Sequence, residues 1–342
     1  MRKSWRTGLG VLAGVTGAVI WALAAAIYQP VMQPDGFWTD SGSGERLPEL
    51  ASNNTYWPRD IRQLAILLAL AGVLLICRGN PRGLTAGAAV TVGWLGADLW
   101  LDRIDVAGAA AAAWLAAGGI AVFAASAVLA HRMSAGADGS PLARHVTATV
   151  AALLAVTTMV VSTPWDEPVS APDRVTVENA LAGLKAALVV LFLAAALALV
   201  VHTAAQLPRV AAFVGVAALG AWLAVGSDGG GKPLGMIVMF VGATLAVAAA
   251  RDVPLGRLLP VAIISGAALL PAAIALYLVG MGVGSAMTVV AGNPPVNGAD
   301  SDLALSFCGL VLGLLLSTLS HLLTRAARQH PRPEAAPVPD AA

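Results

Sequence analysis

Apolar residues along the chain form long runs separated by short polar segments, with no sustained alternation of the kind that marks a half-buried strand. A helix needs about 20 apolar residues to cross the hydrocarbon core of a bilayer. Because lipid offers backbone groups no hydrogen-bond partners, such runs must be helical. The pattern predicts an all-α, polytopic helical membrane protein with ten transmembrane helices, at residues 8–28, 61–77, 84–101, 108–131, 146–163, 180–202, 209–226, 233–250, 258–281 and 303–324.

The composition agrees with a membrane location. Hydrophobic residues make up 58% of the chain, charged residues only 11%, and the mean hydropathy is +0.79. Soluble domains carry about 25% charged residues, so this chain has too few to cover a water-facing surface. No basic cluster with interleaved aromatic residues suggests a nucleic-acid partner. The expected partners are the lipid bilayer, other subunits or a second copy of the chain.

The distribution of charge predicts the orientation. With the N-terminus inside, most of the 20 Lys and Arg residues fall on the cytoplasmic side and most of the 19 acids on the outer side, as the positive-inside rule requires. We therefore expect cytoplasmic N- and C-termini in a plasma membrane. The Ala-rich, Arg-over-Lys usage is typical of a bacterium with a high-GC genome.

The N-terminal segment has a second interpretation. Basic residues precede an apolar run that ends in Ala24, Ala25 and Ala26, so residues 1–26 could be a cleaved signal peptide. The run is longer than the usual signal core of about 7–15 residues, which favours a retained first helix.

The predicted bundle occupies residues 1–328 as a single domain. Its long outer loops are 29–60, 164–179 and 282–302, all rich in Pro, Gly and acids. The aromatic residues of loop 29–60 allow either a packed lid or a disordered excursion. The Pro- and Ala-rich segment 329–342 has no apolar period and is expected to be a disordered cytoplasmic tail.

The stretch GADLWLDRID, residues 96–105, holds the most specific chemistry. On a helix, Asp102 and Asp105 follow Asp98 on one face, with Trp94 one turn below. This is the C-terminal end of the predicted third helix, where the macrodipole favours cations rather than acids. We interpret Asp102 and Asp105 as the outer boundary of that helix.

Asp98 differs because it lies within the apolar run, and an ionisable residue inside a membrane marks a functional site by default. Lys185, at similar depth in the sixth predicted helix, is the first candidate for its partner, and Arg62 is the second. The three residues could bind an anionic or zwitterionic substrate or an ion, or could form a static strut between helices.

The predicted ninth helix contains Pro260, Gly266 and Pro271. Proline removes a helical hydrogen bond and clashes with the preceding turn, so a hinge or broken helix is expected, and transporters often place sites at such breaks. Proline is also common in ordinary membrane helices, so a simple kink remains the alternative.

Motifs for catalysis and cofactor binding are absent from the sequence, including Walker A, the dinucleotide fingerprint, GxSxG and HExxH. We therefore expect no catalytic residues, no cofactor and no metal, although an enzyme is not excluded. The favoured function is a transporter or permease-like subunit for a small or amphipathic solute. The alternatives are a non-catalytic scaffold or accessory subunit, and a membrane enzyme acting on a lipid-linked substrate at the outer face through Asp35, Asp40, Asp166 and Glu167.

Overall fold

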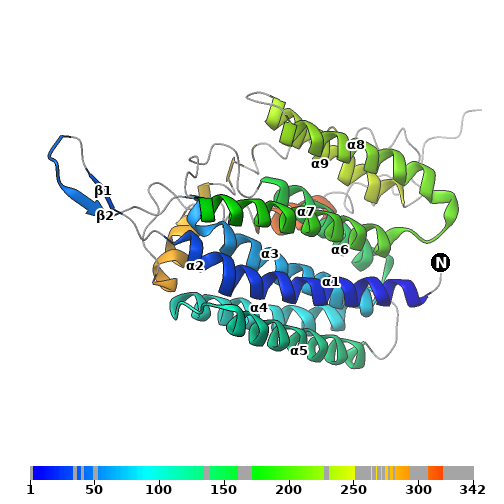
Figure 1. Cartoon of the computed structure of the whole chain (residues 1–342). Helices are drawn as coiled ribbons and strands as arrows, with labels where there is room; N and C mark the ends of the chain where they lie inside the picture. The colour runs from blue at the N-terminus through cyan, green and yellow to red at the C-terminus, as the bar shows by residue number, and fades with distance from the viewer. Residues whose placement is uncertain are drawn as a thin grey trace, which may run out of the picture.

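A computed structural model of the chain forms an elongated helical bundle (Figure 1). The structure describes residues 3–33, 37–39, 42–48, 53–134, 139–160, 172–226, 231–250, 282–292 and 307–318, with single residues between 263 and 279. The expectation of an all-α bundle is confirmed for this part of the chain, apart from one short β-hairpin. The long helices are α1 (Lys3–Leu23), α3 (Asn53–Ile76), α4 (Pro81–Arg103), α5 (Ala109–Met133), α6 (Pro141–Val160), α7 (Pro172–Val200), α8 (Leu207–Gly226) and α9 (Gly231–Ala249).

Helix α3 is the central element. Nearly every residue from Thr55 to Leu75 is buried, and the helix contacts α1, α4, α5, α6 and α7. It begins eight residues before the predicted start at Ile61, so its first turns carry the buried charged residues Arg59, Asp60 and Arg62. A helix that is buried on every side can carry such residues because protein groups, rather than lipid, surround them.

Small residues allow α1 to approach α3 closely. A methyl group at Gly10 would lie 2.8 Å from the carbonyl oxygen of Gly72, and one at Gly17 would lie 2.5 Å from that of Ala65. Both distances are too short for a real side chain. The sequence pattern of glycines four residues apart, Gly10 and Gly14, therefore serves helix packing, as is common in membrane bundles.

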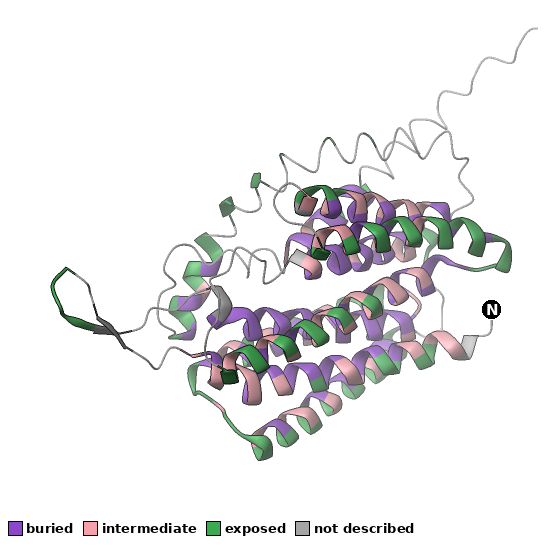
Figure 2. Ribbon diagram, turned by 45° about the horizontal axis from the view of Figure 1, so that its top comes forward, coloured by how far each residue is buried: buried purple, intermediate pink, exposed green. Residues whose placement is uncertain are grey.

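In the described part of the chain, six helical segments are long and apolar enough to cross a membrane: Trp5–Met32, Pro81–Arg103, Ala109–Met133, Pro141–Met159, Pro172–Val200 and Ala204–Gly226. Shorter apolar helices cover Pro233–Ala249, Gly282–Ala291 and Phe307–Thr318. Large apolar side chains point outward from the bundle, including Trp114 at 79% exposed and Trp222 at 68% exposed. Figure 2 shows exposed residues along the outward faces of the helices and buried residues between them. A lipid environment suits such a surface.

The predicted first outer loop contains regular structure. Helix α1 continues through a π-helical turn, η1 (Ala24–Tyr28), into α2 (Gln29–Met32), and the strands β1 (Phe37–Thr39) and β2 (Arg46–Pro48) pair antiparallel. In Figure 1 the hairpin stands away from the end of the bundle. The aromatic residues Tyr56 and Trp57 belong instead to the buried start of α3. The period-two signal was missed because three-residue strands are too short to show it.

Other sequence predictions lie partly or wholly outside the described residues. These are the helix breakers Pro260 and Gly266, the tail 329–342, residues 164–171 of the second outer loop and residues 293–302 of the third. Pro271 is described and is helical. Residues 172–179, expected in a loop, form the first turns of α7, and residues 282–291 form a helix.

Candidate functional site

Two carboxylates share one arginine inside the bundle. The Nε atom of Arg62 lies 2.9 Å from Oδ1 of Asp98, and its Nη2 atom lies 2.8 Å from Oδ1 of Asp102. All three side chains are at most 2% exposed. We call these residues the charge triad.

Trp21 donates a hydrogen bond to the charge triad, and Trp94 packs against Trp21. The indole Nε1 of Trp21 donates a hydrogen bond of 2.7 Å to Asp98 Oδ1, so this carboxylate is engaged by both α1 and α3. The ring of Trp94 meets that of Trp21 edge to face, with centroids 5.3 Å apart and planes at 87°, a favourable aromatic geometry. The hydrogen bond from Trp21 therefore holds the Asp98 carboxylate in place, next to the packed indole rings of Trp21 and Trp94.

Helix periodicity explains why α4 supplies two members of the charge triad. Trp94, Asp98 and Asp102 are spaced four residues apart and are all buried on one face of α4. The predicted face is therefore shared by Trp94, Asp98 and Asp102. Asp102 lies one residue before the end of α4, as the predicted boundary requires, but it is buried and paired with Arg62. Asp105, which was predicted on the same face, follows the end of the helix and is exposed.

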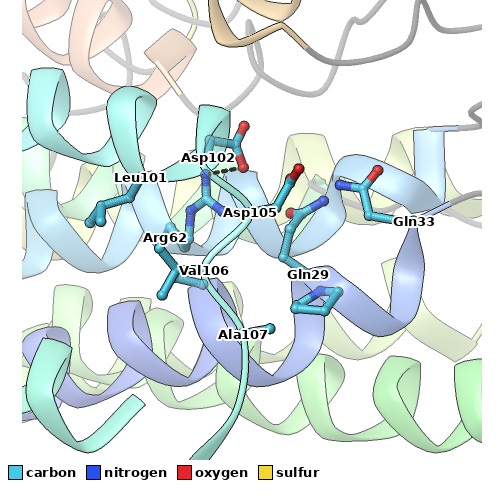
Figure 3. A pocket seen from close by; sticks show the side chains of 10 residues that line it. Gln29, Gln33, Arg62, Leu101, Asp102, Asp105, Val106 and Ala107 are labelled. Atoms are coloured by element: carbon cyan, nitrogen blue, oxygen red, sulfur yellow. Dashed lines mark ion pairs between the residues drawn. The ribbon is translucent and has the colours of Figure 1, made fainter. Parts of the chain in front are cut away.

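A cavity of about 260 Å³ opens beside the charge triad. Figure 3 shows Arg62, Asp102, Asp105 and Gln29 around it. The described lining residues are Ala25, Gln29, Pro30, Gln33, Arg62, Leu101, Asp102, Asp105, Val106 and Ala107. Among them, Arg62 is the one cationic side chain, against two carboxylates.

The π-helical turn η1 forms part of the cavity wall. Its closing bond runs from the backbone N–H of Gln29 to the carbonyl of Ala24, five residues back. The neighbouring carbonyl of Ala26 accepts a 2.8 Å bond from the N–H of Gly108, which ties the loop after α4 to α1. Single π turns inside α-helices are rare and occur often at functional sites.

Backbone strain also occurs here. Asp105 has φ at +49°, one of two described non-glycine residues with positive φ. This left-handed conformation is uncommon outside glycine, although Asp adopts it more readily than most residues. It reverses the chain directly after α4 and brings Asp105 and Val106 to the cavity wall. Strained backbone is typical of binding sites.

Gln29 presents an acceptor at the cavity. Its side chain is 5% exposed, and its Nε2 atom donates a 3.1 Å hydrogen bond to the carbonyl of Thr55. That bond directs the amide nitrogen toward α3. The opposite atom, Oε1, is buried and has no hydrogen-bond partner in the structure, and burying an unsatisfied polar atom costs about 1–3 kcal/mol.

Three arginines tie together the elements around the cavity. Arg59 donates to Thr288 Oγ1 at 3.1 Å, Arg103 to the carbonyl of Val290 at 3.1 Å, and Arg174 to the carbonyl of Gln33 at 3.0 Å. These contacts bring residues from all three predicted outer loops to the same end of the bundle. We call this the pocket end.

At the opposite end of the bundle, the start of α1 contacts the residues that follow α7. Arg6 donates to the carbonyl of Val201 at 2.9 Å and lies 2.9 Å from Nδ1 of His202. Burial lowers the pKa of His202 below its ordinary value, and the neighbouring cations Arg6 and Arg144 lower it further. The imidazole is therefore neutral at pH 7 and accepts the hydrogen bond from Arg6.

Of the three predicted site residues, the structure brings together Asp98 and Arg62 but not Lys185. The Lys185 ammonium lies 5.7 Å from the centre of the Trp57 ring and 3.5 Å from the carbonyl oxygen of Met159. Asp98 is paired with Arg62 instead, since α3 begins earlier than expected and carries Arg62 into the bundle. The sequence also gave little sign of Trp21 and Gln29, because a single Trp or Gln in an apolar run is unremarkable.

Among the described residues, no group of three or more His, Cys, Asp and Glu side chains is arranged to hold a metal ion. The described architecture is a helical bundle with six potential membrane-spanning helices and a charged cavity at one end. No protein-family model, curated protein or solved structure matches the chain.

Proposed function

We propose that this chain is a transporter or permease-like subunit that binds a small solute in the cavity beside the charge triad. The observation that carries the proposal is a buried Arg62 shared by Asp98 and Asp102 directly beside a cavity of about 260 Å³. Ionisable groups inside membrane helices are costly, and they commonly mark solute or ion pathways.

A purely structural role explains this arrangement less well. The desolvation cost of a buried ion pair can exceed the attraction between its charges, so a strut could be built more cheaply from apolar residues. A strut also needs no cavity, no unsatisfied Gln29 oxygen and no second carboxylate. Each of these features suits a site that a ligand completes.

The finer topology belongs to the same proposal. We place the protein in the plasma membrane of a bacterium, with ten spans, both termini cytoplasmic and the pocket end outside. Supporting this, α1 starts and α7 ends at the opposite end, where Arg6 and His202 meet. Arg78, Arg82, Arg132 and Arg144 lie in the connections predicted on that side, as the positive-inside rule requires. In this topology α3 is a span shielded from lipid by its neighbours.

Reconstitution into liposomes tests transport. Vesicles loaded with a mixture of radiolabelled small amines, amino acids and carboxylates should release at least one of them faster when they contain the wild-type protein. Asp102→Asn should slow that release at least tenfold, since it removes the charge of a carboxylate that lines the cavity and pairs with Arg62. Asp173→Asn, an exposed acid on the first turn of α7, is the matched control and should release like the wild type.

The same assay can refute the proposal. If Asp102→Asn inserts and folds but releases every solute at the wild-type rate, the charge triad has no part in transport. A protein that releases none of the solutes above the level of empty vesicles would overturn the transport assignment itself.

A scaffold or accessory subunit is the second candidate. The hairpin that stands away from the pocket end in Figure 1 favours it, because such a projection offers surface to a partner subunit or to another copy of the chain. Purification in mild detergent distinguishes the candidates, since a scaffold should bring down a stoichiometric partner. The proposed carboxylates of a lipid-linked enzyme, Asp35, Asp40, Asp166 and Glu167, all lie outside the described residues.

A further inference from the structure

We infer that the ligand of the cavity is a small organic cation, a short-chain primary ammonium ion. This inference rests on the proposed function and names its substrate class. It departs from the sequence-based expectation of an anionic or zwitterionic ligand, which assumed that Lys185 and Arg62 would both offer positive charge. In the structure, Lys185 lies beside Trp57 and Met159, and the Nε and Nη2 atoms of Arg62 are paired with carboxylates.

The charge around the cavity is the first argument. Asp102 and Asp105 line it, Asp98 is paired with Arg62, and Arg62 is the one cationic residue among the described lining residues. The three carboxylates therefore outweigh the single positive charge of Arg62 and repel an anionic ligand. The cavity also faces the C-terminal end of α4, where the helix dipole adds a partial negative charge. The surplus negative charge and the helix dipole both attract a cation.

The second argument is the geometry of Gln29. Its amide nitrogen is used by the carbonyl of Thr55, so the group left for a ligand is the buried, unpartnered Oε1 atom. An oxygen acceptor requires a ligand that donates a hydrogen bond. A primary ammonium has three N–H donors, enough to reach Gln29 Oε1 and the carboxylates of Asp102 and Asp105 together.

The third argument is size and wall chemistry. Drug-sized ligands occupy cavities of about 300–1,000 Å³, so a cavity of about 260 Å³, just below that range, suits a small molecule. The remaining lining includes the apolar side chains of Leu101, Val106 and Pro30. These contacts suit a short alkyl chain that extends from the ammonium group.

A binding experiment with three matched probes tests the inference. The full-length protein in detergent micelles is dialysed against radiolabelled n-propylammonium, and propionate and β-alanine are added as anionic and zwitterionic competitors. Saturable binding of n-propylammonium is expected, with neither competitor displacing it at equal concentration.

Variants locate the bound cation. Gln29→Leu and Asp105→Asn should each weaken binding about tenfold or more, because the first removes an acceptor for a charged donor and the second removes a negative charge. Gln29→Glu should strengthen it, because it adds a negative charge at the same position. Asp173→Asn, which removes an exposed carboxylate outside the cavity lining, should bind like the wild type. Thermal unfolding of each variant checks that it folds.

Three outcomes would overturn the inference: no saturable binding of n-propylammonium, stronger binding of propionate or β-alanine, or equal binding by folded Gln29→Leu and Asp105→Asn variants. Failure here is distinguishable from failure of transport. If Asp102→Asn abolishes solute release while n-propylammonium does not bind, transport stands and the ligand class is wrong. If n-propylammonium binds at Gln29 but no solute crosses the vesicle membrane, the site stands and the transport proposal fails.

Discussion

At the scale of single residues, Arg62 is the side chain on which the site depends. Its guanidinium group forms ion pairs with both Asp98 and Asp102, and all three groups are removed from water. Breaking a buried pair by removing one partner costs far more than the pair contributes, because a buried charge is left uncompensated. A single substitution in the charge triad should therefore lower the stability of the protein strongly. Combined substitutions that remove the opposing charges together should lower it less.

Arg62→Met should lower the free energy of unfolding by about 3–5 kcal/mol, because it leaves two carboxylates buried without their cation. Combining it with Asp98→Asn and Asp102→Asn should recover most of that loss. Thermal unfolding in detergent, followed by circular dichroism, measures both effects.

Arg103→Met is the control for Arg62→Met, since Arg103 is exposed and donates a hydrogen bond to the carbonyl of Val290 rather than pairing with a buried acid. It should change stability by less than about 1 kcal/mol. If Arg62→Met proves as stable as Arg103→Met, Arg62 does not neutralise two buried carboxylates in the folded protein.

Part of the site could be predicted from the sequence. Asp98 could be singled out because a lone acid inside an apolar run is expensive in lipid, and Arg62 was among its candidate partners. The primary choice of Lys185 was wrong, since matching depth in two helices does not make them neighbours. Asp102 was assigned to the boundary of the predicted helix because hydropathy shows how far a residue lies from the end of an apolar run. It does not show whether another helix buries that residue.

At the scale of secondary-structure elements, the contact between α1 and α3 controls how closely the bundle closes. Trp21 on α1 can reach Asp98 only if α1 packs tightly against α3. Glycine residues along α1 allow this close packing. Gly17 faces the carbonyl of Ala65 at a distance that leaves no room for a methyl group. Trp21 lies one turn further along the same helix.

Gly17→Ala should destabilise the protein by about 1–3 kcal/mol, the usual cost of overpacking, despite the higher helix propensity of alanine. Gly8→Ala is the matched control on the same helix, because nothing lies within 4 Å of a methyl group there. It should be neutral or slightly stabilising. Thermal unfolding of the two variants in one detergent makes the comparison, and equal stability would contradict the tight α1–α3 contact.

The elements were predicted unevenly for physical reasons. Long apolar runs predict helices well, so α4, α5, α6, α8 and α9 fall within about five residues of the expected positions, whereas α7 begins eight residues early. The start of α3 was missed because its first turns are polar. A polar segment suggests a loop when the sequence does not show that it is buried. The hairpin and helix Gly282–Ala291 lie in segments whose Pro and Gly content suggested loops.

At the scale of the whole molecule, the bundle has two chemically different ends. The pocket end collects the charge triad, the cavity and the arginine contacts to Thr288, Val290 and Gln33. The other end joins Arg6 to His202 and Val201. If the molecule spans a membrane as proposed, these ends face different compartments.

Labelling with a membrane-impermeant maleimide tests this orientation. In intact cells, Ser43→Cys, between the hairpin strands at the pocket end, should be labelled, whereas His131→Cys, in the last turn of α5, should react only after the membrane is opened. Cys77 and Cys308 are both buried, so the background should be low, and the wild-type protein measures it. Labelling of His131→Cys but not Ser43→Cys in intact cells would reverse the proposed topology.

The π turn at Ala24–Tyr28 has a further geometric meaning. Each residue of an α-helix advances the chain by about 100° around the axis. A turn that absorbs one extra residue therefore leaves everything beyond it about 100° behind the phase of the preceding helix. Gln29 directly follows this offset. It comes eight residues after Trp21, about 80° around the axis of an unbroken α-helix, and the lag brings it to within about 20° of the face that Trp21 presents. The face that Gln29 turns toward the cavity thus depends on a one-residue phase shift, which a continuous apolar run cannot reveal.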